Sequence, residues 1–143
     1  MPLIAINYLA VAAVAVLSIV LGTLWYGPIF GKPWITMMGF TKADMEKGKK
    51  DMWKYYLAGA FSALVFSYVM VHFVKYMLLV PGFTMDPVQN GMLTGFWAWL
   101  GYSATTSISS VIWEGKPVNL WLINTGYCFV QFIAAGAIFA AWV

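Results

Sequence analysis

The sequence has few of the residues that carry charge and catalytic chemistry. Charged residues make up 9% of its 143 residues, against about 25% in a typical soluble domain, and all eight basic residues are lysines. The lack of arginine and of a basic face argues against nucleic-acid binding. The single cysteine, Cys128, excludes an internal disulfide and a cysteine-cluster metal site. With one histidine and five acidic residues, the chain has little equipment for catalysis, so we expect no enzyme activity, no metal site and no cofactor.

Hydrophobic residues are abundant instead, at 62% of the chain. They gather in four apolar segments, each near the ~20 residues that a helix needs to cross a bilayer. The segments are too long for strands and lack a clean alternation of polar and apolar residues. We therefore predict a single domain, an all-α integral membrane protein whose four transmembrane helices form a bundle. The predicted helices span about residues 3–26, 55–80, 91–113 and 118–142.

Local signals mark how these helices begin and pack. Thr41 and Asp44 fit a capping box, which predicts a short amphiphilic or interfacial helix in the lysine-rich loop before the second segment. Asp86, which precedes a proline, fits the N-cap of the third helix. Gly91 and Gly95 fit the small-residue motif through which membrane helices approach closely.

The lysines predict an orientation. Six of them lie between the first and second segments and one between the third and fourth, whereas residues 81–90 contain none. Because positive charge is retained on the inner side of a membrane, we expect both lysine-bearing loops in the cytoplasm and both termini outside it. Lys75, near the outer end of the second helix, is expected to extend its amine to that interface.

The third segment contains an unusual run of hydroxyl side chains, at six of the eight positions in 103–110. On an ideal helix, with about 100° per residue, these hydroxyls share one side. Two interpretations stay open: small hydroxyl residues let helices pack closely, or the face lines a wet pathway or polar cleft. The candidate residues on this side are Tyr102, Ser103, Thr106, Ser110 and Glu114.

The other polar residues within the apolar segments also have two interpretations. Glu114 could gate the face or bind a cation, or it could form an ion pair with Lys116 or Lys32. His72, which shares a helix face with Tyr68, could relay protons or could be a hydrogen-bonded packing residue.

The fourth segment carries a polar stripe of its own. Asn124, Tyr127 and Gln131 recur at the spacing of one helix face. Because an unpaired amide inside a bilayer is costly, we expect Gln131 to meet another polar side chain.

Several stretches of the chain resemble a known family. They are residues 7–11, 24–34, 38–40, 113–117 and 121–127, and the most specific is the run Trp-Tyr-Gly-Pro-x-Phe-Gly-Lys at 25–32. Together they are similar to the bacterial family of small four-helix membrane proteins catalogued as domain of unknown function 1761. The resemblance implies a four-helix fold in the bacterial inner membrane over nearly the whole chain. It implies no activity and no functional residues.

Three functions remain open at this level. The lack of chemistry and the abundance of small and aromatic residues favour a structural or interaction protein, either a homo-oligomer or an accessory subunit of a membrane complex. The polar faces could instead line the path of a small-solute or ion transporter or channel. The aromatic residues could also bind a lipid, quinone or pigment. The expected partners are membrane lipid, further copies of the chain and other membrane-protein subunits, with no nucleic acid.

Overall fold

Helices make up nearly all of the structure. The computed structural model describes residues 4–82 and 85–142, and within these ranges it contains helices and turns and no strand. Three helices are long and apolar enough to cross a membrane: Tyr8–Ile29, Met52–Leu78 and Val118–Ala141. The prediction of an all-α protein is thus confirmed for the described residues, and three of the four predicted segments, not four, form helices long and apolar enough to cross a membrane.

The first helix changes its winding near its end. The side chain of Asn7 accepts hydrogen bonds from the backbone N–H groups of Leu9 and Ala10 and so starts α1 (Tyr8–Leu24). A π-helical turn, η1 (Trp25–Ile29), follows, and it contains Pro28. Proline has no N–H to donate to the preceding turn, so the α-helical pattern changes here. The chain continues as α2 (Gly31–Met38).

The lysine-rich stretch before the second long helix is mostly helical, which corrects its description as a loop. The hydroxyl of Thr41 accepts from the N–H of Asp44, and the carboxylate of Asp44 accepts from the N–H of Thr41. This capping box opens α3 (Lys42–Lys50), as the sequence predicts. The long helix α4 (Met52–Leu78) comes directly after it.

The third predicted helix, 91–113, is not a continuous α-helix. It starts at α5 (Pro87–Ala98), where Asp86 is the N-cap as predicted, and passes into a π-helical segment, η2 (Trp99–Ala104). Two short pieces follow, α6 (Thr105–Ser107) and α7 (Ser109–Ile112), before the long helix α8 (Val118–Ala141). The hydroxyls of this stretch bond to backbone carbonyls three or four residues earlier, and such bonds compete with regular helix geometry.

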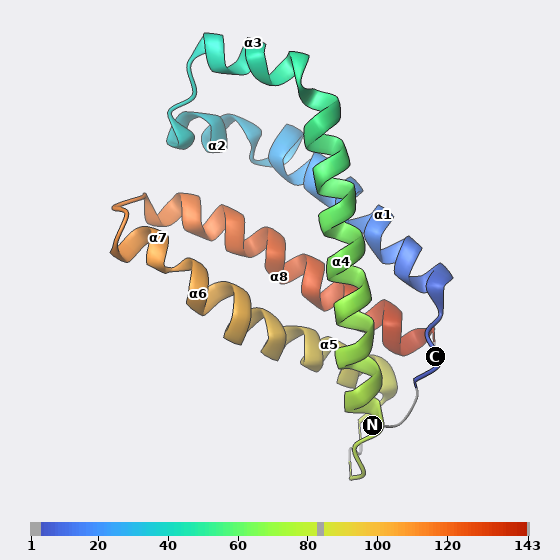
Figure 1. The fold of residues 1–143 in the computed structure, drawn as a ribbon. Helices are drawn as coiled ribbons and strands as arrows, with labels where there is room; N and C mark the ends of the chain where they lie inside the picture. Colours follow the sequence, from blue (N-terminus) through green and yellow to red (C-terminus); the bar gives the residue numbers. More distant parts are fainter. Residues whose placement is uncertain (1–3, 83–84, 143) are drawn as a thin grey trace.

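The helices meet most closely at one end of the molecule, near the two termini (Figure 1). A Cβ atom on Gly91 of α5 would collide with the carbonyl oxygen of Gly136 of α8, and one on Gly95 would collide with the carbonyl oxygen of Phe132. The small-residue motif therefore joins α5 to α8, as predicted. The buried core at this end combines Ala10, Val11 and Val14 of α1, Met70, Val71 and Val74 of α4, Ala98 of α5, and Ala135, Phe139 and Ala140 of α8.

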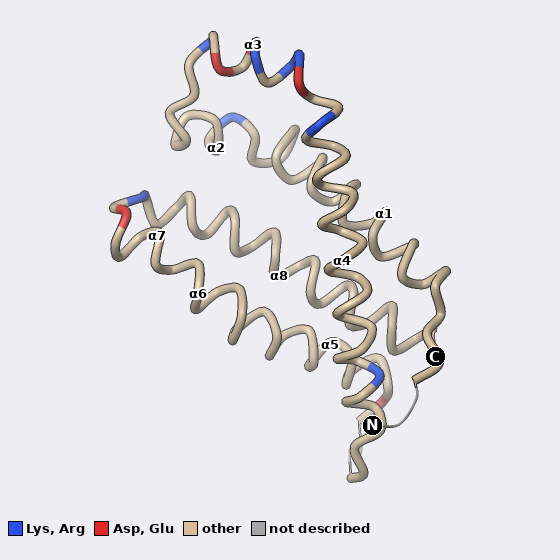
Figure 2. Tube along the Cα trace, viewed as in Figure 1, with Lys and Arg blue, Asp and Glu red and all other residues tan. Residues whose placement is uncertain are grey.

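At the other end the helices diverge. In Figure 1, α2 and α3 lie apart from α7 and the start of α8. The lysines gather at this same end, on α2, α3, the start of α4 and the turn before α8 (Figure 2). Lys75 differs, because it belongs to the last turn of α4. The molecule thus has a closed end at the termini and an open, lysine-rich end.

Candidate functional site

A polar cleft

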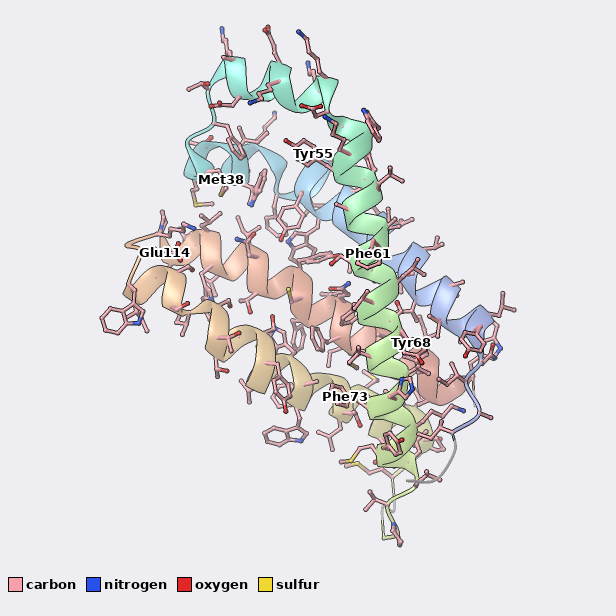
Figure 3. All side chains as sticks on the ribbon, viewed as in Figure 1. Met38, Tyr55, Phe61, Tyr68, Phe73 and Glu114 are labelled. Carbon is pink, nitrogen blue, oxygen red and sulfur yellow. The ribbon has the colours of Figure 1, made fainter. Side chains whose placement is uncertain are left out.

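A cleft of about 1090 Å³ occupies the open end, between α1, α2 and α4 on one side and α7 and α8 on the other. Tyr55 of α4 and Met38 of α2 lie on one side of it, and Glu114 lies on the other (Figure 3). Its lining is mixed. The uncharged polar lining residues include Ser18, Tyr26, Tyr55, Tyr56, Ser62, Ser107, Ser109, Ser110, Asn124, Tyr127 and Gln131, and the apolar ones include Ile19, Trp34, Phe66, Leu120 and Trp121.

The polar stripe of α8 faces this cleft. The carboxamide oxygen of Asn124 accepts a hydrogen bond from the hydroxyl of Tyr26 at 3.1 Å, and the hydroxyl of Tyr127 donates to the carbonyl oxygen of Ser18 at 3.1 Å. Gln131 is half-buried and lines the cleft, and its carboxamide has no hydrogen-bond partner in the described part of the chain. The polar side-chain partner that we expected for Gln131 is therefore not found among these residues.

The π-helical turn η1 attaches α1 to α8 beside the cleft. The indole N–H of Trp25 donates to the carbonyl oxygen of Ile123 at 2.9 Å. Gly126 makes room for this ring, because a Cβ atom there would lie 3.2 Å from it. Since Tyr26 follows Trp25 in the same turn, its hydroxyl is directed to Asn124. The altered winding therefore places two adjacent aromatic side chains on α8.

A second π-helical segment makes the same kind of contact away from the cleft. The indole N–H of Trp99, the first residue of η2, donates to the carbonyl oxygen of Thr125 at 2.9 Å. Its ring packs edge-on against Phe129, with the ring centroids 4.9 Å apart. Each π-helical segment thus begins with a tryptophan that bonds to the α8 backbone.

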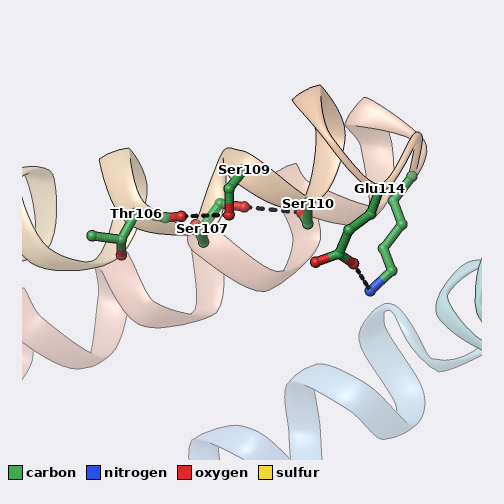
Figure 4. Close-up of polar contacts among 6 residues, drawn as sticks. Thr106, Ser107, Ser109, Ser110 and Glu114 are labelled. Atoms are coloured by element: carbon green, nitrogen blue, oxygen red, sulfur yellow. Dashed lines mark hydrogen bonds and ion pairs between the residues drawn. The ribbon is translucent and has the colours of Figure 1, made fainter.

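The hydroxyl run divides between the cleft and the outer surface. Ser107, Ser109 and Ser110 line the cleft, whereas Thr106 is exposed and bonds to carbonyls of its own helix. Figure 4 shows Ser109 and Ser110 bonded to the preceding turn and Glu114 at the end of the row. An ideal helix predicts one common face, but here the winding changes twice within the run, where η2 ends at Ala104 and where Ile108 separates α6 from α7.

The remaining predicted residues of this segment lie outside the cleft. Tyr102 is 73% exposed, and its ring stacks on that of Phe73 of α4, with the centroids 6.4 Å apart. Ser103 is partly buried and is not among the cleft residues.

The histidine also lies outside the cleft. His72 Nδ1 is 2.6 Å from the backbone carbonyl oxygen of Tyr68, one turn earlier on α4, and the two rings meet edge to face. No group of three His, Cys, Asp or Glu side chains that could hold a metal ion occurs among the residues that the structure describes. This geometry is the one expected if His72 is a hydrogen-bonded packing residue.

Two charged residues stand at the mouth of the cleft. The carboxylate of Glu114 lies 2.6 Å from the amine of Lys116, and both side chains are about half exposed. This is one of the two pairings that the sequence suggests for Glu114. Outside the cleft, the hydroxyl and N–H of Thr41 hold the pKa of the Asp44 carboxyl below its usual value.

Sequence reasoning missed the cleft wall formed by α1 and α4, above all Tyr26, Ser62 and Tyr55. A signal for Tyr26 was present, because Gly27 and Pro28 interrupt an apolar helix directly after it. The prediction placed the end of the first helix at about residue 26 and drew nothing further from this interruption. No local pattern marks Ser62 or Tyr55, whose positions depend on how α4 crosses the other helices.

A family model described as "Protein of unknown function (DUF1761)" matches residues 9–140. The chain belongs to this family. The DUF1761 match includes both π-helical segments and all the cleft residues named above. Comparisons of this DUF1761 protein with curated proteins and with solved structures find no match.

Proposed function

We propose that this protein is a membrane carrier whose cleft binds a small solute. One observation carries the proposal: the cleft is open at the lysine-rich end and closed by the packed core at the other end. A binding cleft with access from one side is what a carrier needs in one of its two states. The interior is too tightly packed at the closed end for a continuous channel, since Val74 and Ala135 there are 0% exposed.

The polar groups of the cleft support a solute-binding role. The carboxamide of Gln131 has no hydrogen-bond partner among the described residues, so its donor and acceptor atoms are available to a molecule in the cleft. Asn124 uses its oxygen for Tyr26 and keeps its amide hydrogens available. A solute with hydroxyl, carbonyl or amide groups can form hydrogen bonds with these side chains.

The setting of the carrier follows from the same proposal. We place the protein in the bacterial inner membrane with all four segments crossing it, the interrupted segment 87–112 included. The positive-inside rule directs the lysine-rich end, and with it the mouth of the cleft, to the cytoplasm. Both termini then lie on the outer side, at the closed end.

Cysteine labelling tests whether the cleft is wet. In a Cys128→Ser background, Gln131→Cys is expected to react with a membrane-impermeant maleimide in inside-out vesicles and not in right-side-out vesicles. Two controls are expected to stay unreactive from both sides: Ala135→Cys, in the packed core, and Phe61→Cys, on an exposed apolar face of α4. If Gln131→Cys is as inert as Ala135→Cys, the cleft is dry and the proposal fails.

A second candidate is the interaction protein that the sequence favours. The volume of about 1090 Å³ is slightly above the range of about 300–1,000 Å³ usual for small-molecule pockets, so a helix of a second copy or of another subunit could also occupy it. Native mass spectrometry after gentle extraction separates the two. A stable oligomer or complex in which Gln131→Cys is protected favours the interaction protein, and a monomer without protein partners argues against it. A lipid, quinone or pigment retained by the monomer would make that molecule the occupant.

A further inference from the structure

The charges of the cleft suggest which solutes it accepts. Among its lining residues, Glu114 and Lys116 carry charge, and these two form an ion pair with each other at the mouth. Every other lining side chain is uncharged at neutral pH. We infer that the cleft takes a neutral solute with several hydrogen-bonding groups and rejects both cations and anions. This inference rests on the proposed function and names the solute class for the same site.

The interior offers hydrogen bonds in both directions. The carboxamide of Gln131 can both donate and accept, the carboxamide of Asn124 keeps its amide hydrogens available, and the hydroxyl of Tyr127, whose hydrogen goes to the Ser18 carbonyl, can still accept. These groups suit hydroxyl, carbonyl or amide groups of a solute. None of them supplies a countercharge, so an ion that enters loses hydration and meets no opposite charge.

The charges outside the cleft do not supply this countercharge either. Lys54 is paired with Asp51 at 2.7 Å at the start of α4, and the remaining lysines of the open end belong to α2 and α3. None of them lines the cleft. They make the mouth positive, which slows the approach of cations and favours anions there without stabilising an anion deeper inside. Lys75 lies beyond the packed core, in the last turn of α4.

The aromatic side chains of the wall add a second preference. Trp34, Tyr55 and Tyr56 line the cleft, and aromatic rings pack well against the apolar face of a flat or ring-shaped solute. The solute class is therefore neutral, with polar groups at its edge and a face that can lie on a ring.

The test measures how charge affects entry, so it does not require the natural solute. In the Cys128→Ser background, Gln131→Cys reports on the interior, and Ser109→Cys, an exposed position on the cleft wall, reports on the mouth. Each is treated with three methanethiosulfonate reagents: neutral hydroxyethyl, cationic trimethylammonioethyl and anionic sulfonatoethyl. The rate of each charged reagent is divided by that of the neutral one at the same position, which cancels differences in thiol reactivity.

We expect both ratios to be about tenfold or more lower at Gln131→Cys than at Ser109→Cys, because only the interior rejects charge. If either charged reagent has the same ratio at the two positions, ions enter freely and the inference is overturned while the wet cleft stands. If none of the three reagents reaches Gln131→Cys although all reach Ser109→Cys, the proposed function fails instead. Asn124→Cys, also half-buried on the α8 wall, repeats the interior measurement if Gln131→Cys does not fold.

Discussion

The two ends of this molecule share the long helices α1, α4 and α8 but are packed in opposite ways. At the closed end, Val74 of α4 and Ala135 and Phe139 of α8 are at most 1% exposed. At the open end, the same two helices present Tyr55, Asn124 and other polar side chains to a cleft. The difference follows from side-chain size and chemistry, since neither α4 nor α8 is interrupted between the two ends.

Small residues close one end because they let backbones touch. The carbonyls of Gly91 and Gly136 occupy the space that a Cβ atom on the opposite glycine would need. At the open end, contacts between α1 and α8 are made by large side chains that reach across, such as Trp25 and Tyr26. Close backbone packing leaves no room for a solute, whereas contacts through long aromatic side chains keep the helices apart.

The largest effect on stability is expected from Gly91→Ala at the closed end. The added methyl group would collide with the Gly136 carbonyl and lie 2.6 Å from Cβ of Ala140, so α5 and α8 must separate. Overpacking of this kind destabilises by about 1–3 kcal/mol. The matched control is Gly59→Ala, because nothing lies within 4 Å of its added methyl group and alanine favours a helix over glycine by about 1 kcal/mol.

Reversible unfolding in detergent micelles gives the free energy of unfolding for both variants. We expect it to fall for Gly91→Ala and to stay equal or rise for Gly59→Ala. Equal stability of the two variants would contradict backbone contact as the basis of the closed end.

The sequence predicted local features at both ends but little of the tertiary arrangement that forms the cleft, for a physical reason. Helix length, the Thr41 capping box, the Asp86 N-cap and the Gly91 packing motif all depend on residues close together in the chain. The cleft depends on residues far apart: the bond from Trp25 joins η1 to a carbonyl 98 residues later.

The hydroxyl run shows most clearly where local reasoning stops. Its six hydroxyls share a side only if the helix through residues 103–110 is regular, but η2 ends inside the run at Ala104 and Ile108 separates α6 from α7. The π-helical winding there accompanies the bond from Trp99 to the Thr125 carbonyl, which is a tertiary contact. Ser110 and Glu114 still line the cleft, but Thr106 does not, and no pattern within 103–110 signals this division.

Replacing either of the two tryptophans should have a smaller effect on stability. The two replacements should differ in their effect on the cleft. Trp25→Phe and Trp99→Phe each remove one indole hydrogen bond to α8. Interhelical hydrogen bonds in membrane proteins contribute about 0.6 kcal/mol on average, so both variants should lose a similar, small amount of stability. Only Trp25→Phe should release α1 beside the cleft, because α5 is also held to α8 by its glycines.

The maleimide labelling rate of Gln131→Cys measures this difference. We expect the rate to rise in the Trp25→Phe background and to stay unchanged in the Trp99→Phe background. Equal rates in the two backgrounds would mean that the Trp25 bond does not control the width of the cleft.

The smallest effect on stability is expected at the mouth of the cleft. Glu114→Gln removes the ion pair with Lys116, but both side chains are about half exposed and the charges are screened by water. Such exposed pairs contribute about 0–1 kcal/mol, so the free energy of unfolding should fall by no more than about 0.5 kcal/mol. The electrostatic effect should be easier to detect, because the variant makes the mouth more positive.

At low ionic strength, the anionic methanethiosulfonate should therefore react faster with Ser109→Cys when Glu114→Gln is present, and the cationic reagent should react more slowly. Both changes should disappear at about 1 M salt, where the Debye length is about 3 Å. At Gln131→Cys, the rate of each charged reagent divided by that of the neutral reagent should not change, because the uncharged side chains around this position determine these ratios. A large change there would show that Glu114 acts on the interior, and the mouth and the interior would then have to be treated as one electrostatic site.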